Sequence, residues 1–443
     1  MTEEVLTIRE GYTYDDSVES FQYIEIDCDN GTGNLNNETD LTITCQNKSA
    51  WLYPHASYLR IDGNFKTADG ANVANNSAVA FTNNGLMYLF SNFKYYLEGK
   101  QIEYFQNVGI TTTIHNYLTK SRNYAGGSWF WLPDRGTTAA DALNGPWRTR
   151  NFYVNPQAAG GVWNFSAIVP LNVISNFCND YRKVLYGMQH KISLNRTNST
   201  RALLRTNNAV AAAGIHPALV ALADDITVNI TTLKWCMPKV TPSLVKQQEL
   251  LSIIKDKEPV PMAFFNKRSE SIIVPAATKF TWKLHLSGGI ERPRGIVIAF
   301  QTGRGEDQTT NNASFDVAGL NVIDAYVLLD GDRYPLSNVA TNYVDHKYAR
   351  WYHEYTNFYN KYNNDNKGEA CLSYFDFLNV APIYVFDISN QPERVKNTQI
   401  NVSLELTFAD NPPDNTIAYA VTYFDSMYIL VSDGEKQLTE VIK

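Results

Sequence analysis

Strict alternation of apolar and polar residues is the most regular pattern in this chain. Residues 400–408 (Ile-Asn-Val-Ser-Leu-Glu-Leu-Thr-Phe) alternate without a break, and residues 280–286, 226–231 and 41–45 repeat the pattern. A period of two places every second side chain on the same face, so each segment predicts a strand with one buried face. Half-exposed strands are typical of antiparallel sandwiches rather than of parallel α/β sheets.

Turn residues between such segments predict hairpins. Residues 93–104 form one candidate, and residues 326–334 form another with Asp330-Gly331 in the turn. Asp-Gly supplies the positive backbone angles that a tight two-residue turn requires. Residues 417–423 and 427–431 predict two more strands near the end of the chain.

A helical period occurs in only three separate segments. Residues 170–187 begin with Pro170, end with Gly187, and present a regular apolar face. A second helix, capped by Asp345, is predicted from the spacing of its aromatic residues up to Tyr362. The apolar positions of these two helices are Leu171, Ile174, Cys178, Tyr181 and Leu185, then Tyr348, Trp351, Tyr355, Phe358 and Tyr362.

The third helical segment suggests where the chain divides. It follows Thr241-Pro242, has an apolar side at Leu244, Leu251 and Ile254, and ends before Pro259. It lies between two strand-rich parts of similar length and has proline at both ends. We therefore expect an all-β fold of two consecutive β-sandwiches with a few inserted helices. The expected boundaries are 1–237 for the first sandwich, 238–260 for a helical connector, and 261–443 for the second sandwich.

Four long segments rich in Gly, Asn and Thr predict loops, at residues 30–40, 63–77, 123–151 and 303–314. Loops of this length on a compact domain usually face solvent or partners. The third loop contains Trp129-Phe130-Trp131, which would form an adhesive patch if it were exposed on a monomer. We expect a partner to cover this cluster, because aromatic residues are enriched at interfaces. The alternative is that the cluster folds back onto its own domain.

Composition and charge exclude several classes of protein. The chain has 443 residues, of which 44% are hydrophobic, so it can form a full core. Lys and Arg number 38 against 45 Asp and Glu, a net charge of −7 without a basic stripe, which argues against sequence-specific nucleic-acid binding. No apolar run approaches the ~18 residues of a membrane span. The N-terminus lacks the features of a signal peptide, so we expect synthesis in the cytosol.

Five cysteines, an odd number, are scattered along the chain at Cys28, Cys45, Cys178, Cys236 and Cys371. No Cys-x-x-Cys motif occurs, so neither a zinc site nor a disulfide framework is expected. Most of these residues have apolar neighbours in the sequence. We predict buried thiols that stay reduced.

Searching for catalytic or metal-binding motifs yields weak candidates only. The carboxylate pairs Asp224-Asp225, Glu306-Asp307 and Asp330/Asp332 all fall in turns or at strand starts, where Asp is common, and Gly-x-Ser-x-Gly, Walker and His-Glu-x-x-His motifs do not occur. We therefore expect no enzyme, and we assign no catalytic residue and no cofactor.

Three candidate ligand sites have simpler interpretations. Residues Asp27 to Glu38 imitate a calcium loop, but Thr32 occupies the position that requires glycine, and strands flank the segment. An ordinary Asn/Gly loop is the alternative there, and no metal residue is assigned. His346 and His353 lack further metal ligands. The aromatic stripe over residues 348–362 fits packing over a sheet better than a ligand platform.

Four segments in order resemble a known family. Residues 85–103, 165–194, 293–301 and 374–408 resemble strands and helices of the double jelly-roll major capsid proteins of the adenovirus and tectivirus lineage. The likeness covers roughly residues 18–435. The chain is short for that lineage, so it is most similar to the virophage and Polinton-type members.

The resemblance implies a structural role in a DNA virus. Two jelly rolls per chain and three chains per unit would make a pseudo-hexagonal homotrimeric capsomer that tiles an icosahedral shell. The implied partners are other copies of the chain, neighbouring capsomers, and penton and minor capsid proteins. The implied location is the virion, after synthesis in the host cytosol. The family has no catalytic motif that could be transferred to this chain.

A second function remains open on the sequence alone. A carbohydrate-binding β-sandwich, such as a viral or surface lectin, would also explain the aromatic residues and the Asn-rich loops. A glycan array and electron microscopy of the expressed protein would separate the two hypotheses.

Overall fold

The computed structural model describes residues 17–31, 35–37, 39–134, 145–156, 161–197, 200–285, 293–304, 308–316, 321–363, 368–390, 401–432 and 436–440. These residues form antiparallel sheets that face each other in pairs, with helices at their junctions. The predicted all-β class is confirmed.

The first half of the chain forms one sandwich. Its larger sheet has the strand order β8-β4-β12-β3-β9, and β1 pairs with β12 at one side. The facing sheet has the order β2-β10-β6-β7, and a small sheet pairs β5 with β11. The strands are β1 (Val18–Asp27), β2 (Asp40–Cys45), β3 (Trp51–Leu52), β4 (Tyr58–Thr67), β5 (Val79–Phe81), β6 (Phe90–Leu97), β7 (Lys100–Gln106), β8 (Asn164–Pro170), β9 (Leu185–Tyr186), β10 (His190–Arg196), β11 (Leu203–Arg205) and β12 (Ile226–Pro242).

The second half repeats this arrangement. One sheet has the order β13-β20-β15-β18, with β21 paired to β20, and the facing sheet has the order β14-β19-β16-β17. Phe300 and Phe408 meet between the sheets, with ring centroids 6.1 Å apart. The strands are β13 (Val260–Ile273), β14 (Lys279–Leu284), β15 (Pro293–Thr302), β16 (Val322–Leu329), β17 (Asp332–Tyr334), β18 (Tyr384–Asp387), β19 (Val402–Phe408), β20 (Thr416–Ser432) and β21 (Lys436–Glu440).

Most of the predicted strands are confirmed, and so are both hairpins. The alternating segment near residue 400 is β19, in which every second residue is buried. The turn between β16 and β17 has positive φ at Asp330 (49°) and Gly331 (95°), as the Asp-Gly pair predicts. The two strands predicted at 417–423 and 427–431 form one continuous strand, β20, because β13 pairs with it along its whole length.

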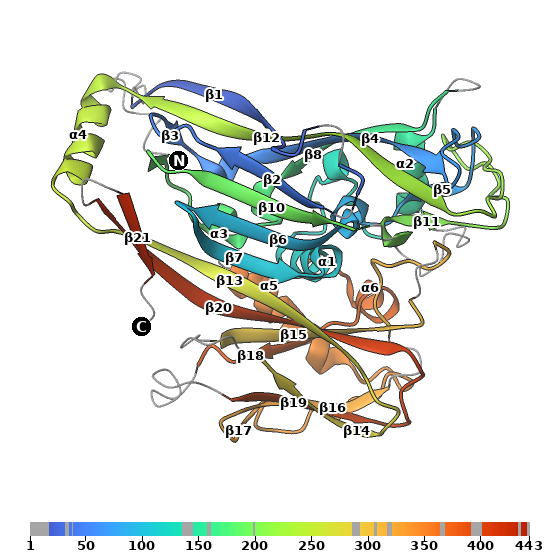
Figure 1. The fold of residues 1–443 in the computed structure, drawn as a ribbon. Coiled ribbons are helices and arrows are strands. Elements are labelled where there is room, and N and C mark those ends of the chain that lie inside the picture. The colour runs from blue at the N-terminus through green and yellow to red at the C-terminus, as the bar shows by residue number, and fades with distance from the viewer. Residues whose placement is uncertain are drawn as a thin grey trace, which may run out of the picture.

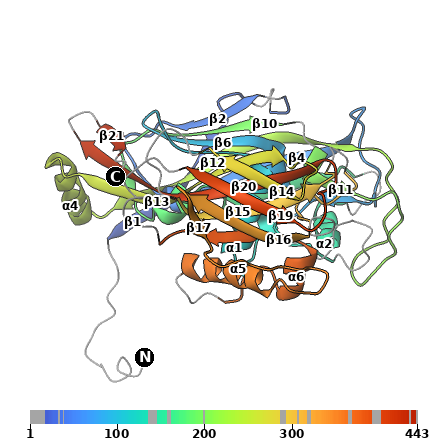
Figure 2. The same ribbon diagram turned by 90° about the horizontal axis from the view of Figure 1, so that it is seen from below.

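Helices lie mainly where the two halves meet. Figure 1 shows the first half above the second, with α1 and α5 between them and α4 at one edge of the molecule; Figure 2 shows α5 and α6 on one side of the sheets. The helices are α1 (Val108–Thr119), α2 (Gly145–Val154), α3 (Asn176–Asp180), α4 (Leu244–Lys255), α5 (Ala349–Tyr362) and α6 (Tyr374–Asn379).

The helix predicted over 170–187 is wrong in extent. A short 3-10 turn at Leu171–Val173 is followed by α3, which has only five residues, and then by β9. Ser175 begins α3 by accepting a hydrogen bond from the amide of Cys178, and Tyr181 leaves helical geometry. The apolar positions of this segment pack into the core, whereas Arg182 and Lys183 are exposed, so the spacing of the apolar positions imitated a single helix.

Helix α1 was not predicted from the sequence. It has Thr at three consecutive positions and no polar face, and each of its residues is buried. Such a helix carries no amphipathic period, because protein surrounds it on all sides. The Thr112 hydroxyl donates a hydrogen bond to the carbonyl of Val108 (2.6 Å), and the Thr119 hydroxyl donates one to the carbonyl of His115 (2.7 Å), each one turn earlier in the helix.

The region between the halves consists of the end of β12, α4 and the start of β13. No residue of α4 is buried, and the helix makes few contacts with the rest of the molecule. Each paired strand has its partner in the same half of the chain. The large buried apolar residues form one continuous cluster that includes both halves.

Candidate functional site

The junction between the halves is built around a buried lysine. Lys267 of β13 has no exposed side-chain surface, and its ammonium enters the first half of the chain. It donates to the carbonyl of Ile174 (2.6 Å) and to the side-chain oxygen of Asn176 (2.7 Å), and it lies 3.5 Å from Glu103 Oε1. Burial lowers the pKa of Lys267, and the nearby Glu103 offsets part of this shift.

Glu103 joins the same network from β7. Its carboxylate accepts from Ser175 Oγ (2.5 Å) and from the amide of Asn176 (2.9 Å) at the start of α3. Asn176 in turn donates to the carbonyl of Phe265 (2.6 Å) in the second half. Each buried charge is therefore hydrogen-bonded, which is the condition under which a buried ion pair is tolerated. The network fixes the position of β13 against β7 and α3.

A loop of the second half forms a second anchor. Gln308 is fully buried and forms two bonds to the backbone of Ile226 at the start of β12, donating to its carbonyl (2.6 Å) and accepting from its amide (2.9 Å). Asn311 donates to Asp134 (3.0 Å) and accepts from Thr82 (2.8 Å). We expected residues 303–314 to face solvent or partners. Gln308 and Asn311 are instead buried within the molecule, because their amides replace water as partners for first-half groups.

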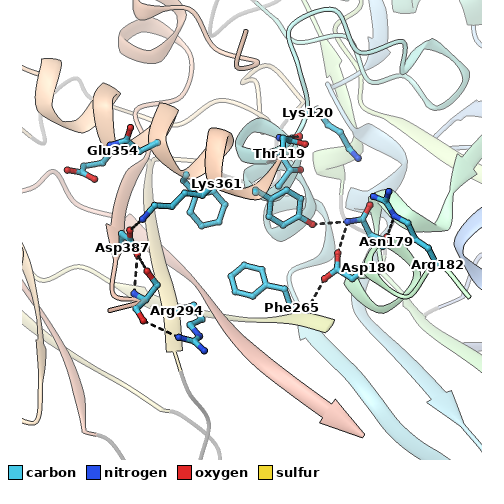
Figure 3. A pocket seen from close by; sticks show the side chains of 15 residues that line it. Thr119, Lys120, Asn179, Asp180, Arg182, Phe265, Arg294, Glu354, Lys361 and Asp387 are labelled. Carbon is cyan, nitrogen blue, oxygen red and sulfur yellow. Dashed lines mark hydrogen bonds and ion pairs between the residues drawn. The ribbon is translucent and has the colours of Figure 1, made fainter. Parts of the chain in front are cut away.

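A cleft of about 540 Å³ opens at the same junction. Figure 3 shows it between the end of α3, the second half of α5, and strands β13, β15 and β18. Its apolar wall is formed by Phe265, Phe358 and Tyr362, and its polar wall by charged side chains and amides. The charged lining residues are Lys120, Asp180, Arg182, Arg294, Glu354, Lys361 and Asp387.

Exposed apolar side chains are gathered in several areas instead of one. On β1, Phe21 and Tyr23 are each 47% exposed, with ring centroids 5.7 Å apart, and Tyr23 lies 5.2 Å from the ring of Tyr58. Other areas lie on α4, on α6, near α2, and on the far side of the second sandwich. Their exposed apolar members are Leu244 and Val245, Tyr374 and Phe375, Tyr153, Ile215 and Val220, and Ile323, Leu336 and Val344.

The aromatic cluster of the long loop is not an exposed patch. Trp129 and Trp131 are each 1% exposed and stack on each other with ring centroids 5.4 Å apart. Phe130 packs on Phe81, and Trp147 is also buried. The expectation that a partner covers this cluster is therefore wrong, because the loop packs its aromatic residues into the core of its own half. Tyr153 of the neighbouring helix α2 is exposed.

All five cysteines are buried and unpaired, as predicted. Burial raises the pKa of the Cys178 thiol, as it does for the other four. Thiols of this kind remain protonated and unreactive near neutral pH.

The carboxylates of these pairs for which contacts are seen bind structural partners. Asp225 pairs with Arg205 (2.9 Å), and Asp330 accepts from the amide of Asn401 (2.9 Å). Glu306 and Asp307 lie outside the described residues. His346 and His353 are both exposed, and the stripe on α5 buries Trp351, Tyr355 and Tyr359 against the sheet.

The segment that imitates a calcium loop is only partly described, since Thr32 and Glu38 lie outside the described residues. Asp29 accepts from Thr44 Oγ1 (2.6 Å), and Asp27 pairs with Lys234 (3.4 Å). Within the described ranges, no three His, Cys, Asp or Glu side chains are grouped in a way that could hold a metal ion. The helices described here include none that is both long and apolar enough to span a membrane.

The junction network and the cleft were not predicted from the sequence. Their residues come from segments that are far apart in the chain, and no local spacing links Lys120, Asp180 and Lys267.

Comparison with known families gives a match over most of the chain. The model of the double jelly roll-like domain matches residues 79–428. No curated protein matches the sequence significantly.

Solved structures share the fold along nearly the full length. A chain of the Sputnik virophage superposes with a TM-score of 0.59 at 10% identity, covering 99% of this chain and 92% of that one. The mavirus major capsid protein superposes with a TM-score of 0.57 at 12% identity, covering 98% of this chain and 93% of that one. The Faustovirus major capsid protein superposes with a TM-score of 0.52 at 10% identity, covering 96% of this chain and 93% of that one. Identities this low demonstrate a common fold, and the fold expected from the resemblance is confirmed. This chain belongs to the double jelly roll-like domain family.

Proposed function

We propose that the protein is a viral major capsid protein whose trimers form pseudo-hexagonal capsomers of an icosahedral shell. The observation that carries this proposal is the full-length fold match to the major capsid proteins of mavirus and Faustovirus, together with the family model over residues 79–428. The fold alone does not fix a function. The remaining support comes from the surface and the junction.

The junction suits a structural block. Buried polar anchors and a continuous apolar cluster hold the two halves in one orientation. A shell subunit needs this rigidity because its neighbours contact both halves at once. We infer that residues 1–237 and 261–443 are the two jelly rolls of one subunit and that residues 238–260 connect them. Limited proteolysis within the exposed α4, followed by sizing of the fragments, tests this division.

The surface suits contacts with several neighbours. Exposed apolar residues occur on β1, α4, α6 and the second sandwich, whereas a monomer that acts alone usually keeps such groups few and scattered. In a trimer that tiles a shell, each of these areas would meet a different neighbour. The contacts within the trimer would be large, on the order of 2,000–5,000 Å².

The proposal includes partners and location. Other copies of the chain, adjoining capsomers, and penton and minor capsid proteins are the proposed partners, and the virion is the proposed location after synthesis in the host cytosol. With a net charge of −7, the protein has no need of direct contact with the genome. We propose no enzymatic role.

No observation favours the lectin hypothesis. On α5, Trp351, Tyr355 and Tyr359 are buried, and the partly exposed rings of Phe358 and Tyr362 line a cleft with charged walls instead of forming an open sugar-binding platform. Electron microscopy of the expressed protein tests the capsid proposal, which predicts hexagonal blocks or closed particles. A field of 50.0 kDa monomers that bind glycans on an array would contradict it.

A further inference from the structure

The cleft between the halves contains more positive charge than its own carboxylates match. Asp387 pairs with Lys361, and Glu354 pairs with Arg350 (2.7 Å) outside the cleft. Asp180 accepts from the amide of Phe265 (2.8 Å) and from Asn179 Nδ2 (2.8 Å). The three carboxylates that line the cleft therefore already have donors.

Two cations in the lining lack such a partner. Arg294 is held by Asp425 (2.6 Å), but neither Lys120 nor Arg182 forms an ion pair with any carboxylate in the described part of the chain. Arg182 uses only its Nε, which donates to the carbonyl of Asn179 (3.2 Å). Lys120 lies over the ring of Tyr124, with the ammonium 5.0 Å from the ring centroid. Figure 3 shows both cations on the same side of the cavity.

The cleft also has an aromatic wall, in which the Tyr362 hydroxyl accepts a hydrogen bond from Asn179 Nδ2 (3.0 Å). Phe358 and Tyr362 stack with ring centroids 6.2 Å apart, and Phe265 lies 6.3 Å from Tyr362. All three side chains are only half-buried, so parts of the rings remain available to a ligand. The cleft thus offers unmatched positive charge and an apolar surface within about 540 Å³, a volume typical of specific ligand sites.

We propose that this cleft binds a short acidic peptide segment of another polypeptide, with a carboxylate at Lys120 and Arg182 and an apolar side chain against Phe358 and Phe265. A peptide supplies both groups in adjacent residues. A nucleic acid would bring a row of phosphates to a protein of net charge −7, and a neutral sugar would leave both cations unmatched. The inference rests on the proposed function for the source of the segment, a neighbouring or minor capsid protein.

The binding test uses the full-length protein and two synthetic peptides. The first is an acetylated pentapeptide of alternating phenylalanine and glutamate, and the second replaces each glutamate by glutamine. Calorimetric titration at low salt should show binding of the acidic peptide and at least tenfold weaker binding of the glutamine peptide, because charged groups form the stronger hydrogen bonds. Equal affinity for both peptides, or no binding of either, would overturn the proposal.

Matched variants localise the site. Arg182 is exposed, so Arg182→Gln should leave the fold intact and weaken binding about threefold or more, and Lys120→Gln should weaken it about tenfold. Lys183 is the adjacent exposed cation, but it does not line the cleft, so Lys183→Gln should change the affinity by less than about twofold. An equal loss in Lys183→Gln, or binding of an oligosaccharide or oligonucleotide that Arg182→Gln does not affect, would refute the assignment.

Native mass spectrometry of the same samples separates this inference from the proposed function. Capsomers that do not bind the acidic peptide would refute the cleft assignment and leave the capsid proposal standing. Monomers that bind it with the expected variant pattern would support the cleft and contradict the capsid proposal.

Discussion

Lys267 and Glu103 carry opposite charges into the junction between the halves, where neither side chain has exposed surface. Burying charges costs free energy, which is recovered only when every donor and acceptor has a partner. Here the partners come from α3, β7 and β13, so the network is complete only when the two halves are together.

Removing one charge of this pair should destabilise the protein strongly. We predict that Lys267→Met lowers the free energy of unfolding by about 3–5 kcal/mol, because Glu103 is left buried without its cation. Adding Glu103→Gln should restore part of the loss. Urea denaturation measures the free energy of unfolding of the single and the double variant. Lys283→Met, at an exposed position of β14, is the control, and its free energy of unfolding should lie within about 0.5 kcal/mol of the parent. A loss in Lys267→Met no larger than in the control would show that the network is not stabilising.

Lys120 should make stability depend on pH. Burial, with a smaller contribution from Lys267, lowers the pKa of Lys120 to about 8 from an ordinary value of 10.5. Between these values the unfolded chain binds more protons than the folded one, so stability rises with pH. The titratable and charged groups facing Lys120 and its cleft are Lys267 on β13, Asp180 at the end of α3, Arg182, Tyr124, Arg294 on β15, Glu354 and Lys361 on α5, and Asp387 on β18.

Comparison with Lys120→Gln isolates this effect from other titrating groups. From pH 7 to pH 10 the parent should gain about 2 kcal/mol of unfolding free energy relative to Lys120→Gln. Chemical denaturation at several pH values measures the difference. A constant difference across this range would mean that Lys120 titrates with an ordinary pKa.

Individual residues were predictable where local chemistry decides their place. The burial of the cysteines was predicted correctly because their neighbours in the sequence are apolar. The turn at Asp330-Gly331 was predicted correctly because it needs positive φ angles. Lys267 was not predictable, because the face of β13 that carries it would be open to solvent if the first half did not cover it.

At the scale of elements, α1 forms a helix although its residues have low helix propensity, because tertiary packing stabilises it. Its β-branched residues favour strands, and Gly109 disfavours a helix, yet contacts on all sides hold it helical. Gly109 permits a close approach, because a Cβ built there would lie 2.5 Å from ring atoms of Tyr88.

Substituting Gly109 should therefore reverse the usual effect of alanine in a helix. Gly109→Ala gains up to ~1 kcal/mol from propensity, but overpacking against Tyr88 should cost more, for a net loss of about 1–3 kcal/mol. Gly145→Ala, at the start of α2, has no atom within 4 Å of the new Cβ and should be neutral or slightly stabilising. Thermal unfolding compares the two, and a stabilised Gly109→Ala would contradict the packing described here.

The predictable elements were those with a solvent-exposed face or with proline at their ends. Strand β19 ends within a few residues of its expected limits because its exposed face makes every second residue polar. Helix α4 does so because proline residues flank it. The apolar positions of residues 171–185 and all residues of α1 are buried, so hydrophobic periodicity could not distinguish a long helix from short ones.

For the whole molecule, the shared cluster and the polar anchors imply that the halves stabilise each other. We predict a single cooperative unfolding transition in calorimetry, with equal calorimetric and van't Hoff enthalpies. Cleavage at a protease site placed at Gln247-Gln248 in the exposed α4 should leave the two fragments associated on a sizing column. Two separated transitions, or fragments that part after cleavage, would show independent halves.

Order and spacing of segments were enough to suggest the double jelly-roll fold, because each sandwich repeats the same strand patterns. The contacts between the halves were not predictable, since they join residues such as Gln308 and Ile226 that no local pattern relates. The expectation that a partner covers the aromatic cluster was wrong for the same reason: burial of Trp129 and Trp131 depends on how the long loop folds back over its own half.

Native mass spectrometry of the purified full-length protein over a dilution series tests the capsomer proposal most directly. An obligate interface of the proposed size should persist well below micromolar concentration, so the account predicts a mass of about three times 50.0 kDa, or larger particles built from that unit. A protein that remains a 50.0 kDa monomer at every concentration, and forms no particles at the highest, would contradict it.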